Sequence, residues 1–239
     1  MGSNVYACIL AGGQGSRMGN AERPKQFLEI GNKPIIIHTI EKLMIHSEFE
    51  KIIVLTPGAW ISHMNDIADK YIVESDRIVI IEGGEERNDT LMNAVNFIDE
   101  NYGIDDATII LTHDSVRPFV SHRIIMENLE CAKKFGACDT VVAASDTIVE
   151  SDDGKVITSI PERNRMYQGQ TPQTFRGRKI KEIYESLSSD EKKTLTDACK
   201  ILTLRGEVVH LIEGDVSNIK ITFPSDIRIA NALIGGEAC

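Results

Sequence analysis

The sequence of 239 residues has no run of apolar residues that approaches the roughly 18 needed for a membrane-spanning helix. It also lacks an opening stretch of charged and then apolar residues, which is the pattern of a secretory signal peptide. Both absences predict a cytoplasmic protein without a membrane partner. The five cysteines form no C-x-x-C pair and are odd in number, so we expect buried free thiols in a reducing compartment.

Positive charge is scarce as well, with 26 Lys and Arg against 36 Asp and Glu and a net charge of −10. This balance disfavours nucleic acid and anionic membranes as partners. An acidic protein that binds a polyanionic small molecule must gather its few cations at one place. The positions of individual Arg and Lys residues are therefore more informative than their number.

Three glycines lie close together near the start of the chain, directly after the apolar run Val5–Leu10. A run without polar alternation is typical of a strand that is buried on both faces of a parallel sheet. The glycines let the backbone turn and expose N–H groups that can bind phosphate oxygens, and Arg17 and Lys25 add two cations. Together these features predict a nucleotide triphosphate site. The residues that we expect to bind the nucleotide here are Leu10, Ala11, Gly12, Gly13, Gly15, Ser16, Arg17 and Lys25.

Two familiar phosphate-binding motifs are absent from this loop. Gly13-x-Gly15 is followed by the next glycine at position 19, which does not fit the dinucleotide fingerprint, and no Gly-Lys-Ser/Thr of a Walker loop exists. The alternative is a purely structural turn after the strand. A structural turn does not require two cations, which favours the nucleotide site.

Short β-rich runs alternate with helical patterns over most of the chain. The predicted strands are 5–10, 52–55, 77–81, 108–111, 140–143, 208–212 and 219–222, and the predicted helices are 34–46, 60–70, 88–100, 122–135, 179–187, 197–204 and one from residue 224. The spacing predicts one α/β domain over residues 1–239 with a doubly wound, mostly parallel, Rossmann-like sheet. Ligands bind outside the carboxyl ends of the strands in such sheets, where the loops after Leu10, Ile81 and Leu111 lie.

One segment interrupts this alternation. Asp146–Glu150 and Lys155–Ile160 are β-rich, and Ser151–Gly154 joins them with residues typical of a turn. The pattern predicts a β-hairpin arm inserted at about residues 145–170. An isolated two-stranded hairpin is marginally stable in water. We therefore expect a homodimer that is formed through this arm.

A second group of candidate residues follows the predicted strand Thr108–Leu111. Asp114 stands at the carboxyl end of this strand beside the glycine loop and is suited to hold Mg²⁺, which takes only one or two protein carboxylates. The alternative is that Asp114 only pairs with Arg117 or caps the next helix. We expect His113 to pack or form hydrogen bonds, and no other His or Cys stands at the spacing of zinc ligands, so no zinc site is predicted.

A third group follows the predicted strand that ends at Ile81. Two glycines and the start of a helix leave free N–H groups that suit a base or a ribose. The alternative is a helix N-terminus capped by Asn88, which does not exclude nucleotide binding. The candidate nucleotide-binding residues of the second and third groups are Gly84, Arg87, Asn88, Thr90, Asp114 and Ser115.

The motif L-A-G-G-x-G-x-R-M with a following P-K resembles the sugar-nucleotidyltransferase superfamily. The segments H-D-S-V-R-P, Q-T-P-Q-T-F and S-N-I-K-I-T narrow the resemblance to the cytidylyltransferases that act on small polyol phosphates. The similarity spans positions 5 to about 234. This family contains a branch that uses methylerythritol 4-phosphate, in isoprenoid synthesis, and a branch that uses ribitol 5-phosphate, in teichoic-acid synthesis of the cell wall.

The resemblance implies a Mg²⁺-dependent transfer of the cytidylyl group of CTP to the phosphate of a polyol. It also implies that Ser115 contacts the nucleotide and that the arm supplies Arg163 to the site of a neighbouring subunit. The implied catalytic residues are Arg17, Lys25, Arg163 and Lys220, and the implied substrate-binding residues are Arg117, Arg163, Thr171 and Lys220.

The segments Met166–Gln173, Thr196–Lys200 and Trp60–His63 resemble the ribitol branch, so the predicted products are CDP-ribitol and pyrophosphate. The nearest alternative is the methylerythritol branch, whose members usually show Leu-Trp before the Thr-Pro-Gln segment. A non-catalytic nucleotide-binding protein is an alternative of another class, and it is disfavoured by the intact residues Arg17, Lys25, Asp114 and Lys220. A glycosyltransferase would usually carry Asp-x-Asp where this chain has His-Asp-Ser.

Overall fold

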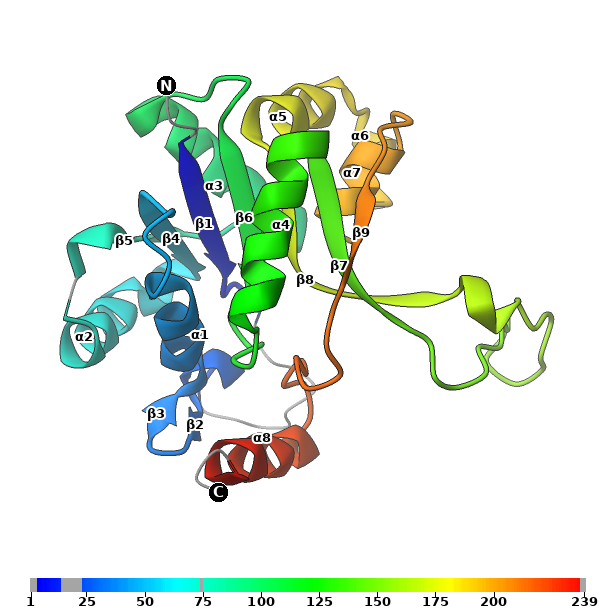
Figure 1. Cartoon of the computed structure of the whole chain (residues 1–239), viewed down its shortest axis with the longest axis horizontal. Coiled ribbons are helices and arrows are strands. Elements are labelled where there is room, and N and C mark those ends of the chain that lie inside the picture. The colour runs from blue at the N-terminus through cyan, green and yellow to red at the C-terminus, as the bar shows by residue number, and fades with distance from the viewer. Residues whose placement is uncertain (1–3, 14–22, 74, 237–239) are drawn as a thin grey trace.

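A computed structural model describes residues 4–13, 23–73 and 75–236, and Figure 1 shows their arrangement. A mixed sheet of seven strands in the order β5-β4-β1-β6-β8-β7-β9 forms its centre. The strands are β1 (Val5–Leu10), β4 (Lys51–Thr56), β5 (Ile78–Glu82), β6 (Ile109–Asp114), β7 (Ala137–Ala143), β8 (Tyr167–Arg176) and β9 (His210–Glu213). β8 is antiparallel to both of its neighbours, and the other pairings are parallel. The predicted α/β class is confirmed.

Helices cover both faces of the sheet. On one face lie α1 (Ile35–Met44), α2 (Ile61–Tyr71) and α4 (His122–Phe135), and on the other lie α3 (Arg87–Tyr102), α5 (Gly177–Ser186) and α7 (Ala198–Thr203). Along β1, residues 5, 7 and 9 join the core of the first face and residues 6, 8 and 10 join that of the second. The unbroken apolar run of β1 is therefore explained by burial on both sides. The four cysteines in the described residues are free and buried, as predicted.

A smaller unit lies at the carboxyl edge of the sheet. β2 (Glu29–Ile30) and β3 (Lys33–Pro34) form a tight hairpin, in which Gly31 and Asn32 have φ values of 53° and 71°. The hairpin packs on α8 (Pro224–Gly236), the helix that was predicted from residue 224. A third small core joins them, made of Ile30, Ile35, Val116, Ile221 and Ala230. The short helix α6 (Ser189–Lys193) completes the fold.

The inserted arm projects far from the sheet between β7 and β8 (Figure 1). Its predicted turn is present, with Gly154 at a φ of 71° and its N–H donating to Ser151 Oγ at 3.0 Å. The two predicted strands are wrong in extent, because their pairing is reduced to one antiparallel bridge between Glu150 and Ser159. Because the arm projects away from the other elements that the structure describes, its two segments have only each other to pair with among those residues (Figure 1).

Two further predictions of strands differ from the structure. Residues 219–222, expected to form a strand, are extended without strand pairing, although the Ile221 N–H donates to the carbonyl of Val116 at 2.9 Å. The strand β8 was not predicted, because its sequence is largely polar and includes a proline. In the part of the chain that the structure describes, no helix has the length and apolar character required to cross a membrane.

Candidate functional site

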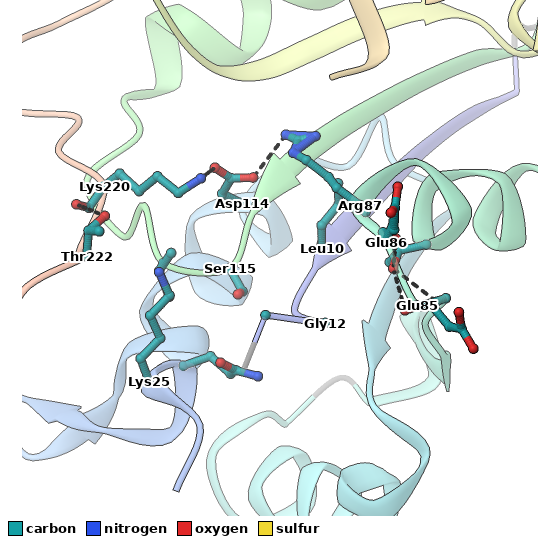
Figure 2. Close-up of a pocket in the computed structure, with 15 residues that line it drawn as sticks. Leu10, Gly12, Lys25, Glu85, Glu86, Arg87, Asp114, Ser115, Lys220 and Thr222 are labelled. Atoms are coloured by element: carbon teal, nitrogen blue, oxygen red, sulfur yellow. Dashed lines mark hydrogen bonds and ion pairs between the residues drawn. The ribbon is translucent and has the colours of Figure 1, made fainter. Parts of the chain in front are cut away.

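The site lies where β1 and β6 end side by side. The register pairs Leu10 with Asp114, and the loop after β1 and the turn after β6 leave the sheet at the same edge. β4 and β5 lie on one side of β1 and β6 lies on the other, so the strand order reverses at this point, where α/β sheets bind ligands. A cavity of about 290 Å³ opens here (Figure 2). Its lining residues are Leu10, Gly12, Gly13, Lys25, Gln26, Gly84, Glu85, Glu86, Arg87, Thr90, Asp114, Ser115, Val116, Lys220 and Thr222.

Three cations from different parts of the chain surround the Asp114 carboxylate. Arg87 Nη2 lies 3.0 Å from Oδ1, and Lys220 Nζ lies 2.8 Å from Oδ2 (Figure 2). Arg117 Nε lies 3.7 Å from Oδ2. Burial alone would raise the pKa of the Asp114 carboxyl, but these cations outweigh burial and hold the pKa well below its usual range. Asp114 is therefore ionised at any physiological pH.

Lys25 also reaches the cavity, from a segment other than those that carry Asp114 and Arg87, as Figure 2 shows. Its Nζ donates to the carbonyl of Ile221 at 3.2 Å, which connects the segment after the glycine loop to the segment that carries Lys220. The short helical turn Lys25–Phe27 is anchored beneath by Phe27, which stacks on Trp60 with ring centroids 5.2 Å apart. The amine is thus positioned by aromatic packing and by a backbone acceptor.

Close packing joins the glycine loop to the N-terminus of α3. Gly84 N donates to Thr90 Oγ1 at 3.0 Å, and a Cβ on Gly84 would overlap the Cβ of Asp89. A Cβ on Gly12 would lie 3.3 Å from Thr90 Oγ1. Because only glycine leaves this room, β1 and α3 approach each other closely at the cavity.

The alternative that Asn88 caps the N-terminus of α3 is wrong. Glu86 is the N-cap, with an extended backbone, and it forms a capping box with Asp89. Asn88 instead lies in the first turn, buried, with its side-chain oxygen lacking a hydrogen-bond partner among the described residues. The prediction failed because Asn is the commoner cap, whereas here the capping box selects Glu86.

The structure brings most of the predicted nucleotide-binding residues to one cavity. Those that line it are Leu10, Gly12, Gly13, Lys25, Gly84, Arg87, Thr90, Asp114 and Ser115, and Lys220, predicted as a catalytic and substrate-binding residue, lines it too. The predicted residues Gly15, Ser16 and Arg17 lie outside the described residues. The cavity residues that the sequence analysis missed are Gln26, Glu85, Glu86, Val116 and Thr222. Each stands within two positions of a predicted residue, and this adjacency was the available signal.

Other predicted residues lie away from the cavity lining. Ala11 and Asn88 are buried beside it, and Arg117 and Thr171 are buried behind Asp114. The Thr171 hydroxyl accepts the backbone N–H of Asp114 at 3.1 Å. Arg163 is exposed on the arm, where its Nη1 donates to the carbonyl of Ser145 at 3.2 Å.

The protein side chains at the cavity suit a cation whose other ligands are phosphate oxygens and water. Among the described residues, no three His, Cys, Asp or Glu side chains converge as metal ligands. The ionised Asp114 carboxylate lines the cavity, and Mg²⁺ typically uses only one or two carboxylates together with phosphate oxygens and water. Asp114 is therefore the candidate protein ligand for such a cation, which would take the place of Arg87 or Lys220 at one carboxylate oxygen.

Comparisons with known proteins agree over nearly the whole chain. The model of the family described as IspD, 2-C-methyl-D-erythritol 4-phosphate cytidylyltransferase, matches residues 5–236. The fold is similar to that of 4-diphosphocytidyl-2C-methyl-D-erythritol synthase from Anaerococcus prevotii, with 27% identity, a TM-score of 0.79, and coverage of 98% of this chain and 97% of that one. It is also similar to 2-C-methyl-D-erythritol 4-phosphate cytidylyltransferase from Francisella tularensis, with 28% identity, a TM-score of 0.80, and coverage of 96% and 99%.

Proposed function

The chain belongs to the IspD family of cytidylyltransferases and is a nucleotidyltransferase, and on this premise we propose that it joins CTP and D-ribitol 5-phosphate to give CDP-ribitol and pyrophosphate. The observation that supports cytidylyl transfer most directly is the convergence of Lys25, Arg87 and Lys220 on one cavity around the Asp114 carboxylate. The lining also holds carboxylates, at Asp114 and at Glu85 and Glu86, and the three cations are the charged groups there that can bind the oxygens of a triphosphate.

The reaction needs no covalent intermediate with the protein. An oxygen of the polyol phosphate attacks the α-phosphorus of CTP and forms a new P–O bond, while the bond from that phosphorus to the α–β bridging oxygen breaks. Pyrophosphate leaves with the electron pair of the broken bond, and no proton has to be moved because the attacking phosphate is already ionised. Catalysis therefore consists of positioning and charge neutralisation.

Each cation has a role in this proposal. Lys25 and Arg17 stabilise the negative charge that develops on the triphosphate, and Lys220 binds the attacking phosphate. Arg87 lines the cavity at the start of α3, and its guanidinium pairs with Asp114. In this proposal the backbone N–H groups at the start of that helix bind the nucleotide. Asp114 contributes the protein ligand of Mg²⁺, and the metal neutralises phosphate charge when bound.

The identity of the polyol is supported by the segment that leads along β8 to Thr171. Residues 167–170 read Tyr-Gln-Gly-Gln, and the Gln170 side chain is already ordered by the carbonyl of Asp215 at 2.8 Å. The oxygen of the same amide accepts Asn218 Nδ2 at 3.1 Å, so Gln170 is engaged within the protein. The support for ribitol 5-phosphate therefore comes from the resemblance of this segment to the ribitol branch.

A homodimer completes the proposal. Arg163 stands on the projecting arm and does not line the cavity of its own subunit in the described structure. Apolar side chains are exposed along the arm, with Val156 at 64%, Ile157 at 56% and Ile160 at 60%. A second copy of the chain would cover this surface and would place Arg163 at the neighbouring phosphate site.

The deciding experiment is pyrophosphate release with each of the four nucleoside triphosphates, Mg²⁺, and either ribitol 5-phosphate or methylerythritol 4-phosphate. We expect release with CTP and ribitol 5-phosphate. Preference for methylerythritol 4-phosphate, the substrate in the description of the matched family, would replace the ribitol proposal by that second candidate. Release with neither polyol phosphate and CTP, by folded protein, would refute both.

A further inference from the structure

Four buried residues behind Asp114 form a closed cycle of hydrogen bonds, named here the buried ring. His113 Nε2 donates to the carbonyl of Arg117 at 3.0 Å, and Arg117 Nη1 donates to the carbonyl of Asn218 at 2.6 Å. Asn218 Nδ2 donates to the carbonyl of Thr171 at 2.9 Å. The Thr171 hydroxyl donates to His113 Nδ1 at 2.9 Å and closes the cycle. All four donors point the same way around the buried ring.

A fifth hydrogen bond fixes this direction. The backbone N–H of Asp114 donates to the Thr171 hydroxyl oxygen at 3.1 Å, so the proton of that hydroxyl is directed to His113 Nδ1. His113 then carries its own proton on Nε2, as the bond to the Arg117 carbonyl requires. Burial lowers the pKa of His113 to about 4, which agrees with a neutral imidazole.

The buried ring connects three segments that are remote in sequence. His113 and Arg117 belong to the end of β6 and the turn after it, Thr171 belongs to β8, and Asn218 belongs to the extended segment near the C-terminus. His113 directly precedes Asp114, and Asn218 stands two positions before Lys220. The buried ring is therefore attached to both partners of the 2.8 Å ion pair that crosses the cavity wall.

Members of the buried ring are almost fully enclosed by the protein. His113 and Asn218 have an exposed fraction of 0%, and Thr171 and Arg117 have 3% and 8%. Within the described residues, none of the four lines the cavity. Each of the four donors that form the cycle has an acceptor, and such a buried polar network specifies a single arrangement of the segments that it joins.

We propose that the buried ring is a positioning device, which holds Asp114 and Lys220 at the separation that cytidylyl transfer requires. This proposal rests on the proposed function, because cytidylyl transfer is the reaction that the positioning would serve. For Arg117 and Thr171, this role through Asp114 and Lys220 stands beside the direct substrate contact that the family resemblance implies.

The first test compares two variants of one residue. Thr171→Val removes the hydroxyl and keeps the shape, and we expect kcat to fall about 10- to 100-fold while the KM for CTP changes by less than about threefold. Thr171→Ser restores the hydroxyl and should keep kcat within about threefold of the wild type. Thr174→Val is the matched control, because its buried hydroxyl on the same strand bonds Asn128 at 3.2 Å, outside the buried ring. A wild-type kcat in folded Thr171→Val would overturn the proposal.

A double-mutant cycle that combines Thr171→Val with His113→Phe tests whether the two residues act as parts of one hydrogen-bond ring or through independent contacts. Either single change opens the same cycle, so the double variant should be about as slow as the slower single variant. Losses that multiply would show independent roles and would overturn the proposal. His113 cannot contact a substrate, so a fall in kcat in its variant with retained folding is itself a result that direct contact does not explain.

Nitrogen-15 NMR of labelled histidines tests the buried ring without turnover. The His113 signals, assigned with His113→Phe, should show a proton on Nε2 and none on Nδ1, and Thr171→Val should change this pattern. The opposite tautomer in the wild type would overturn the buried ring whatever the substrate. The expected tautomer in a wild type without turnover would instead refute the proposed function, and with it the positioning role in cytidylyl transfer, while the hydrogen-bond arrangement of the buried ring would stand.

Discussion

The Lys220 amine lies 2.8 Å from Asp114 Oδ2, although Asp114 ends a strand in the middle of the chain and Lys220 lies near its C-terminus. The Asp114 carboxylate thus both orients a lysine and stands at the edge where β1 meets β6. A ligand phosphate that binds Lys220 must compete with this carboxylate or share the amine with it. The pair keeps the lysine extended over the cavity before the ligand arrives.

Replacing Lys220 by methionine should lower kcat/KM about 10²–10³-fold, because a charged donor at the reacting phosphates is lost. Lys33→Met is the control, since Lys33 forms a more exposed ion pair with Glu41. Pyrophosphate release measures the effect, and thermal unfolding checks that both variants fold. Equal activity in the two variants would contradict the role of Lys220.

Asp114→Asn should reduce both activity and stability. The substitution leaves Arg87, Arg117 and Lys220 without their shared counter-charge, and breaking a buried ion pair typically costs about 3 kcal/mol or more. Denaturant unfolding gives the free energy of unfolding, and the Mg²⁺ dependence of pyrophosphate release tests the metal role. A variant with the wild-type Mg²⁺ dependence would contradict Asp114 as the metal ligand.

Gly84→Ala should weaken CTP binding and destabilise the protein by about 1–3 kcal/mol, because the added methyl overlaps Asp89 and pushes the start of α3 away. Gly235→Ala serves as the control, since a Cβ there meets no atom within 4 Å. Calorimetry with CTP and thermal unfolding measure the two effects. CTP affinity that is equal in both variants would show that the close approach at Gly84 is unimportant for the nucleotide.

Asp139 should make the protein less stable as pH rises. Burial raises the pKa of its carboxyl to about 6, although Gln173 donates a hydrogen bond to it. The folded state therefore disfavours the ionised form, and stability falls as pH increases from about 4 to 6. Asp139→Asn should raise the free energy of unfolding at pH 7 by up to about 3 kcal/mol and should change it little at pH 3.5.

The same measurement on Asp152→Asn, an exposed position on the arm, provides the comparison. Its free energy of unfolding should show little change at either pH. A gain for Asp139→Asn that is equal at pH 3.5 and pH 7 would contradict titration of Asp139 as the cause.

Arg163→Ala and Lys220→Ala should complement each other in a mixture if the arm serves the neighbouring subunit. Each homodimer is poorly active, but a mixed dimer has one site with both residues, so random exchange restores activity to about one quarter of the sites. Arg163→Ala alone should bind CTP normally and turn over poorly. A mixture that stays as inactive as its components, despite exchange of subunits, would place Arg163 in its own subunit's site.

Much of the sheet was predictable because its strands are apolar and its helices carry clear end signals. The bounds of α4 agree fully with the prediction, since Ser121 caps its start and Gly136, with a φ of 98°, ends it. β1 and its glycine loop were equally clear, because burial on both faces leaves an unbroken apolar run.

The remaining elements depend on tertiary contacts that a linear pattern does not show. β8 is held by side-chain hydrogen bonds, such as Thr140 Oγ1 to the carbonyl of Pro172 at 2.6 Å, rather than by apolar residues alone. Residues 219–222 have the alternation of a strand but find no strand beside them. Gly31 and Asn32 are typical of a hairpin turn, and the hairpin was not predicted because its two strands are very short.

The third small core makes the complete cavity dependent on both the N-terminal and the C-terminal part of the chain. Ile221, Ala230 and the β2–β3 hairpin must meet before Lys220 and Lys25 can face each other across the cavity. A fragment that ends before Asn218 retains the strands of the central sheet but supplies neither the second lysine nor the packing that seats the first. Only a chain in which the β2–β3 hairpin has packed against the C-terminal segment can therefore bind the substrate.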